Sequence, residues 1–148
     1  MFIQKELAAR LAVLHQYPIQ KLEVLKFDSS EFKCPSSEQE IIIHWGDRLK
    51  FDDVLHFWLV SIQSDDWSYR SEYFLPYAQS GKCLALSEVK FNNLANGYLL
   101  DLKYPPSLPL HSESSFIGAL QMYDDWNDIA AVAAYANSYI SFYWSTSA

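Results

Sequence analysis

The chain has 148 residues, half of them hydrophobic, with 5 Trp, 10 Tyr and 9 Phe and a net charge of −7. This length is typical of one domain that buries roughly two-thirds of its unfolded surface, and so large an apolar fraction excludes intrinsic disorder. The excess negative charge lies after residue 50. It would repel phosphate backbones and anionic lipids, so nucleic-acid and membrane binding are disfavoured and a basic protein partner is favoured. The alternative is that this charge only keeps an aromatic-rich domain soluble.

The two cysteines, Cys34 and Cys83, form neither a disulfide framework nor a metal-ligand spacing, which is typical of a cytoplasmic protein. The N-terminal residues mix charges into their apolar pattern and lack a small-residue cleavage signature, so we expect no signal peptide. No apolar run approaches the length of a transmembrane span.

The N-terminal part of the chain predicts one helix and then a strand. Ile3, Leu7, Leu11 and Leu14 recur at helical spacing and predict an amphipathic helix that ends before Pro18. The alternation over residues 21–27 predicts a strand with one half-buried face.

The next two segments predict further sheet. Residues 38–45 fit either element, because Pro35 and Ser36 resemble a helix start whereas three consecutive isoleucines favour a strand. Residues 54–62 are dense in β-branched and aromatic side chains, which predicts a buried strand.

The stretch from residue 73 to residue 104 predicts the middle of the sheet. Its apolar runs, at 73–77, 83–91 and 98–102, are divided by Gly and Asn, which favour chain reversals. We therefore expect three successive strands there. The three prolines that follow, between residues 105 and 109, predict an extended connection.

The C-terminal part predicts a helix that begins near residue 123, capped by Asp124 or Asp125. Ile129, Val132 and Ile140 fit helical spacing, and an aromatic side could meet a partner or a second copy in a homodimer. The predicted fold is therefore a single α+β domain over residues 1–148. It has a mainly antiparallel twisted sheet flanked by an N-terminal and a C-terminal helix.

No catalytic centre is predicted. His44, His56, Asp52 and Asp53 are the nearest approach to a metal or acid-base cluster, but their spacing matches no ligand motif. Adjacent acids such as Asp124 and Asp125 point in different directions, and no nucleophile has an evident base. We expect no enzymatic activity, no cofactor and no metal.

Two acidic and aromatic segments are candidates for a partner-binding surface. Trp, Tyr and Arg dominate binding hot spots, and surrounding acids steer a basic partner. The alternative for each is a Trp that covers the edge of the core beside solvated acids. The candidate residues are Asp65, Asp66, Trp67, Tyr69 and Arg70 in the first segment, and Asp124, Asp125 and Trp126 in the second.

Three short segments resemble the SUKH superfamily of bacterial immunity proteins, which belong to polymorphic toxin systems. They are FLPYAQSG at residues 74–81, the run at 83–86 and NGYLLDL at 96–102, and residues 126–142 resemble the closing helix of the family. The resemblance implies an α+β domain without catalysis that binds and blocks a cognate toxin, often a nuclease. An acidic surface suits such a basic nuclease.

The leading hypothesis is thus a cytoplasmic immunity protein that neutralises a basic toxin. Two alternatives stay open. One is a small-ligand or enzyme domain with a pocket lined by Tyr and Trp, and the other is a structural subunit that self-associates.

Overall fold

The structure is a computed structural model that describes residues 4–17, 20–65, 71–106 and 115–147. The helices in these ranges are α1 (Gln4–Ala12), α2 (Val54–Gln63), α3 (Ser71–Gln79) and α4 (Glu88–Leu99). The strands are β1 (Glu23–Phe27), β2 (Gln39–Asp47), β3 (Leu84–Leu86), β4 (Phe116–Asp125), β5 (Asp128–Tyr135) and β6 (Ser138–Thr146).

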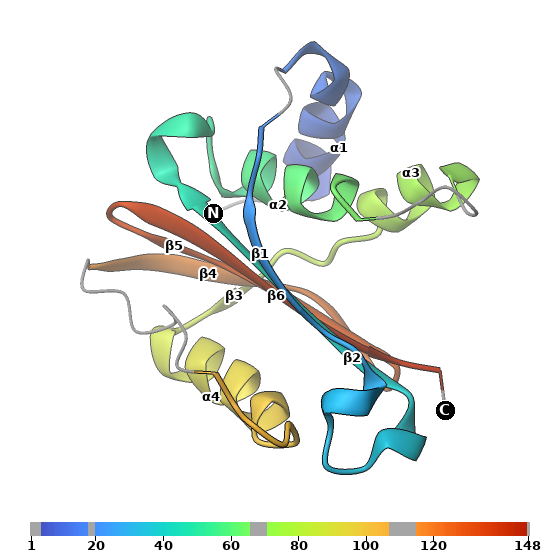
Figure 1. Ribbon diagram of the computed structural model, residues 1–148. Helices are drawn as coiled ribbons and strands as arrows, with labels where there is room; N and C mark the ends of the chain where they lie inside the picture. The colour runs from blue at the N-terminus through green and yellow to red at the C-terminus, as the bar shows by residue number, and fades with distance from the viewer. Residues whose placement is uncertain (1–3, 18–19, 66–70, 107–114, 148) are drawn as a thin grey trace.

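The strands form one sheet in the order β1-β2-β6-β5-β4-β3, and every neighbouring pair is antiparallel. Helices α1, α2 and α3 cover one face of this sheet, and α4 covers the other (Figure 1). The predicted α+β class with an antiparallel sheet is confirmed. None of the helices in the described ranges is long and apolar enough to cross a membrane.

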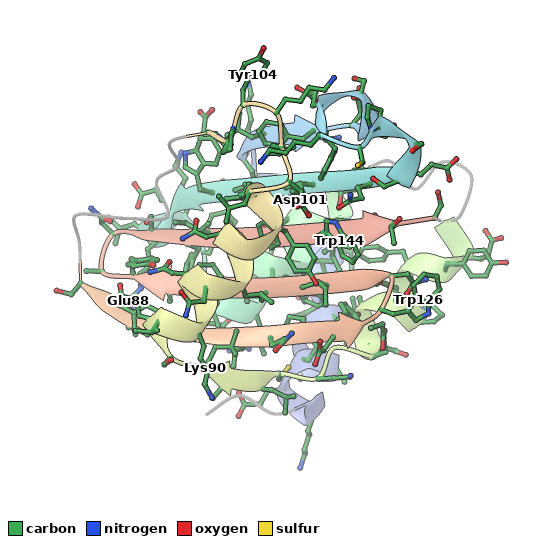
Figure 2. The ribbon with its side chains drawn as sticks, turned by 90° about the horizontal axis from the view of Figure 1, so that it is seen from below. Glu88, Lys90, Asp101, Tyr104, Trp126 and Trp144 are labelled. Carbon is green, nitrogen blue, oxygen red and sulfur yellow. The ribbon has the colours of Figure 1, made fainter. Side chains whose placement is uncertain are left out.

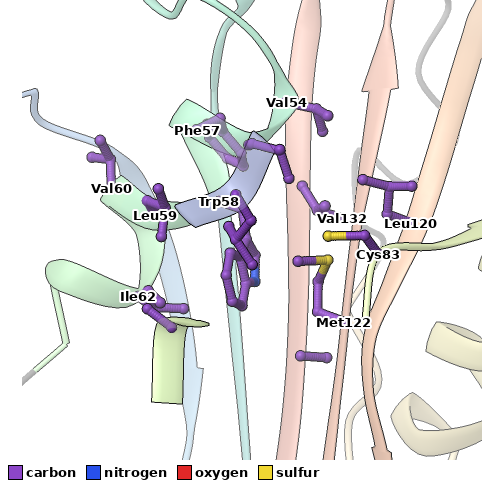
Figure 3. Close-up of a cluster of buried hydrophobic side chains, with 14 of the residues drawn as sticks. Val54, Phe57, Trp58, Leu59, Val60, Ile62, Cys83, Leu120, Met122 and Val132 are labelled. Carbon is purple, nitrogen blue, oxygen red and sulfur yellow. The ribbon is translucent and has the colours of Figure 1, made fainter. Parts of the chain in front are cut away.

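Each face of the sheet has its own hydrophobic core. Trp58 of α2 packs with Met122 and Val132 on the face covered by three helices (Figure 3). Phe91 of α4 packs with Phe142 on the opposite face. Strand β5 therefore sends alternate side chains into two different cores, as the period-2 geometry of a strand requires.

The predicted C-terminal helix is wrong, because residues 123–143 form the end of β4, then β5 and β6. Both faces of these strands are covered, so the sequence is apolar without the alternation that marks a half-exposed strand. Ile129 and Val132 were expected on one helical face, but they lie in opposite cores. Tyr139 and Phe142, which would lie on the aromatic side of such a helix, are buried in the sheet.

The predicted strand over residues 54–62 is also wrong, because these residues form α2. Every side chain from Val54 to Ile62 is buried, so the helix is apolar around its whole circumference and shows no helical stripe. The Asp53 carboxylate accepts a hydrogen bond from the His56 backbone N–H at 2.8 Å and caps the helix.

Of the three strands predicted between residues 73 and 104, only Leu84–Leu86 is a strand. Residues 73–77 belong to α3, which contains Pro76, and residues 98–102 complete α4 and the turn after it. The Ser87 hydroxyl caps α4 by accepting from the Lys90 N–H at 3.2 Å. The N-terminal helix and the strand at 21–27 are confirmed, and residues 39–47 are the strand β2.

Candidate binding site

A cavity of about 680 Å³ lies on the face of the sheet that carries α1, α2 and α3, beyond the C-terminal end of α2. The ten residues of α2 span about 15 Å, whereas the nine-residue strands β2 and β6 span about 30 Å, so α2 leaves one end of the sheet uncovered. We call this site the acidic cavity. Its lining residues are Lys26, Glu38, Glu40, Ile62, Asp65, Tyr73, Tyr77, Asn127, Asp128, Tyr143, Ser145, Thr146 and Ser147.

The register of three strands places polar side chains on the floor of the acidic cavity. Glu40 of β2 lies opposite Ser145 of β6, which in turn lies opposite Asp128 of β5. Residues paired across neighbouring strands point to the same face, so these three side chains form a row. Tyr143 lies two residues before Ser145 in the same strand. Its side chain therefore points to the same face, nearer the core.

Asp128 is held by an aromatic pair from two elements. The Tyr77 hydroxyl donates a hydrogen bond to Asp128 Oδ1 at 3.3 Å, and the Tyr77 ring stacks on Tyr123 with ring centroids 4.4 Å apart. The Tyr123 hydroxyl donates in turn to the main-chain carbonyl of Tyr77. Burial raises the pKa of Asp128 to about 6, and the hydrogen bond from Tyr77 opposes that rise.

Asp65, just after α2, enters the same cavity without a partner for one of its oxygens. Its Oδ1 is buried, and no described residue donates a hydrogen bond to it. His44 Nε2 is 3.6 Å away, which is too long for a hydrogen bond. Burial raises the pKa of Asp65 to about 6, and the positive charge of Lys26 opposes that rise.

His44 does not neutralise Asp65. Burial and the nearby Lys26 lower the pKa of His44 to about 4, so its ring is neutral at pH 7. The Ser64 hydroxyl donates to the Ser61 carbonyl at 2.7 Å, so it accepts from His44 Nε2 at 3.1 Å. The N–H of His44 is therefore directed to Ser64, and its neutral ring supplies no positive charge to ionised Asp65.

Among its described lining residues, the acidic cavity carries four carboxyl side chains against one amine. The acids are Glu38, Glu40, Asp65 and Asp128, and the amine is Lys26. The Glu38 carboxylate accepts a hydrogen bond from the Ser147 hydroxyl at 2.8 Å. Burial raises the pKa of Tyr143 to about 12, so the tyrosine stays neutral. Carboxylates beside neutral aromatic rings are suited to binding a cation.

The predicted residues Asp124, Asp125 and Trp126 lie at the tip of the β4–β5 hairpin. Trp126 and Asn127 form its two-residue turn, and the Trp126 side chain is 74% exposed. Asn127 and Asp128 continue from this tip into the lining of the acidic cavity, and Figure 2 shows Trp126 at that end of the sheet. The structure thus brings Asp65 and the second predicted segment to one end of the molecule. Four other predicted residues, Asp66, Trp67, Tyr69 and Arg70, lie outside the described residues.

Of the thirteen described lining residues only Asp65 belongs to the predicted partner-binding set, so sequence reasoning missed twelve, among them Lys26, Glu40, Tyr77, Asp128 and Tyr143. In the sequence, Asp128 adds a further acid to the segment of Asp124, Asp125 and Trp126, and it also fits a charge near the start of the predicted C-terminal helix. Its position at the start of an apolar strand would have been the signal for a site at the end of the sheet. For the others no signal exists in the sequence, because the pairing of β2, β5 and β6 brings them together.

The candidate cluster of His44, His56, Asp52 and Asp53 is split between two places. His44 lies behind the acidic cavity, whereas the other three join α1 to α2. Arg10 Nη2 is 2.7 Å from Asp53 Oδ2, and the Tyr17 hydroxyl donates to Asp52 Oδ2 at 2.7 Å.

The ring of His56 is part of the same joint. It stacks on Tyr17 with centroids 3.9 Å apart, and its Nδ1 accepts from the Asp52 N–H at 3.0 Å. Burial lowers the pKa of His56, which favours the neutral ring at this joint. In the described part of the chain, no three His, Cys, Asp or Glu residues are placed to hold a metal ion.

Comparison with family models, with curated proteins and with solved structures yields no match for this chain. The site is therefore interpreted from its own geometry.

Proposed function

We propose that the protein is a cytoplasmic immunity protein that binds and neutralises a basic toxin through the acidic end of its sheet. One observation carries this proposal. An exposed Trp126, preceded by Asp124 and Asp125, stands beside a cavity whose described lining holds four acids and one amine. Exposed tryptophans are frequent binding hot spots, and surrounding acids raise the rate of encounter with a basic surface.

The composition of the chain supports the same class of partner. The net charge of −7 favours a basic protein, and among toxins a nuclease fits this charge because its substrate-binding surface is basic. Both cysteines, the exposed Cys34 and the buried Cys83, are free thiols, which supports a reducing compartment such as the cytoplasm.

The test is protection of living cells. The chain is co-expressed with the toxin-like product of a neighbouring gene, and survival is counted. We expect survival with the wild-type chain and a loss of protection with Trp126→Ala. The matched control is Tyr104→Ala, since Tyr104 is 88% exposed but lies away from the hairpin tip (Figure 2). Killing in the presence of the wild-type chain, or full protection by Trp126→Ala, would contradict the proposal.

A second candidate function is the binding of a small molecule in the acidic cavity. Its volume of about 680 Å³ is in the range of ligand pockets, and three tyrosines, Tyr73, Tyr77 and Tyr143, contribute to its lining. A thermal-shift screen of metabolites tests it. A metabolite that raises the melting temperature of the wild-type chain, and fails to do so for Tyr77→Ala, would favour this function.

A further inference from the structure

We propose that the acidic cavity binds a guanidinium or alkylammonium group, with Asp65 and Asp128 as its counter-charges and tyrosine rings as its walls. We assign this group to a basic side chain of the protein partner. That assignment rests on the proposed function.

The first argument is that, among the described residues, the carboxylates of the cavity outnumber its positive charges. Among the described lining residues Lys26 is the only amine, and no described carboxylate lies within ion-pair distance of it. The neutral His44 gives its N–H to Ser64 and not to Asp65. The cavity therefore holds negative charge that a bound cation can compensate.

The second argument is the unsatisfied oxygen of Asp65. A buried acceptor without a donor destabilises a protein, and most such groups in native structures have a partner. Asp65 Oδ1 is buried and unpartnered among the described residues. Guanidinium and ammonium groups consist of N–H donors with a positive charge, and they match this oxygen and the carboxylate of Asp128.

The third argument concerns the walls. A basic side chain consists of an aliphatic stem and a charged head, and the stem needs apolar contact. Ile62 and the rings of Tyr77 and Tyr143 supply that contact inside the cavity, while the 58% exposed Tyr73 stands at its entrance. Cations bind favourably over tyrosine faces, so these rings suit the head as well.

The position of the cavity suits a side chain that a protein partner presents. Asn127 belongs both to the cavity lining and to the hairpin turn that carries the exposed Trp126. A partner that covers Trp126 would bring its neighbouring side chains over the cavity entrance. Insertion of one basic side chain would then anchor the contact.

The test is a titration of the isotope-labelled full chain, followed by NMR, at low salt and about pH 8, where both buried carboxylates are ionised. The probe is N-acetyl-arginine amide. The control is N-acetyl-citrulline amide, which has nearly the same shape and no charge. We expect saturable shifts at Asp128 and Ser145 with a Kd on the order of 1 mM, and binding of the citrulline compound at least about tenfold weaker. Equal affinity for the two probes, or no saturable shift, would overturn the inference.

Variants identify the groups responsible. Asp65→Asn and Asp128→Asn should each weaken arginine binding by about tenfold, the usual effect of losing a charged hydrogen-bond partner. Lys26→Met should tighten it, because the competing positive charge is removed. The control is Asp101→Asn, an exposed acid just after α4 on the opposite face. The amide spectra show whether each variant is folded. Unchanged affinity in both folded cavity variants would overturn the inference.

A second probe separates a partner side chain from a free small molecule. We expect an acetylated Gly-Gly-Arg-Gly-Gly amide to bind at least as tightly as the single capped arginine. Binding of the single residue without binding of the peptide would contradict the partner assignment. These titrations need no toxin, so their failure is distinguishable from failure of the protection assay.

Discussion

The Tyr77 hydroxyl donates to Asp128 Oδ1 across 3.3 Å, which joins α3 to the first residue of β5. This contact fixes α3, which borders the acidic cavity, to β5. Strand β5 supplies one of the carboxylates of the cavity. The stacking of Tyr77 on Tyr123 holds the donor in place. The hydrogen bond therefore links the carboxyl of Asp128 to α3 and favours its ionised form against the effect of burial.

Tyr77→Phe should raise the pKa of Asp128 above about 6, because the hydrogen bond from Tyr77 stabilises the ionised carboxylate. The expected loss of folding stability is about 1 kcal/mol. Carbon-detected NMR titration of the Asp128 carboxyl group measures the first effect, and urea unfolding the second. Tyr73→Phe is the control, since Tyr73 is largely exposed. An unchanged pKa in Tyr77→Phe would show that the hydrogen bond does not act on Asp128.

Asp128→Asn should stabilise the folded chain at pH 7. The pKa of this carboxyl is raised on folding, so the folded state binds protons more tightly than the unfolded state, and ionisation destabilises it. With allowance for partial exposure, the expected gain is about 1 kcal/mol. The gain should shrink as pH falls from about 7 to about 4, where the wild-type carboxyl is protonated in the folded state.

Urea unfolding of the wild type and of Asp128→Asn at several pH values measures this difference. Asp101→Asn again serves as the control and should show no comparable pH dependence. A destabilised Asp128→Asn at pH 7 would mean that the charge of Asp128 is already compensated within the protein.

Asp53 has two structural roles that two substitutions separate. Its carboxylate caps α2 through the His56 N–H at 2.8 Å and pairs with Arg10 at 2.7 Å. Asp53→Ala removes both and should lower the free energy of unfolding by about 1–2 kcal/mol. Asp53→Asn keeps a capping oxygen and loses only a partly exposed ion pair, so it should cost less than about 1 kcal/mol. Equal losses in thermal or urea unfolding would assign the stabilisation to the ion pair instead of the cap.

The elements that the sequence predicts correctly are those with one exposed face. In α1, Leu7 and Leu11 are buried while the residues between them include exposed ones, so the helical period is visible. In α2 and β5 nearly every side chain is buried, and no period distinguishes a helix from a strand. Apolar density predicted correctly that residues 54–62 are buried, but it predicted the type of neither element.

The candidate site likewise has residues that stand out in the sequence and residues that do not. Composition singles out Asp65 and the hairpin tip at Asp124, Asp125 and Trp126 as candidates, because acids and Trp stand out locally. Tyr77 and Asp128 lie 51 positions apart, and only the packing of α3 on the hairpin brings them together. A cavity formed by long-range strand pairing and helix length leaves no local signal.

The central claim, that the acidic end of the sheet binds a basic partner, is tested most directly by calorimetric titration of the purified chain with its toxin at two salt concentrations. We expect tight binding that weakens with salt, a loss of about 30-fold in Trp126→Ala, and a change within about twofold in Tyr104→Ala. Salt-independent binding that Trp126→Ala leaves intact would contradict the claim.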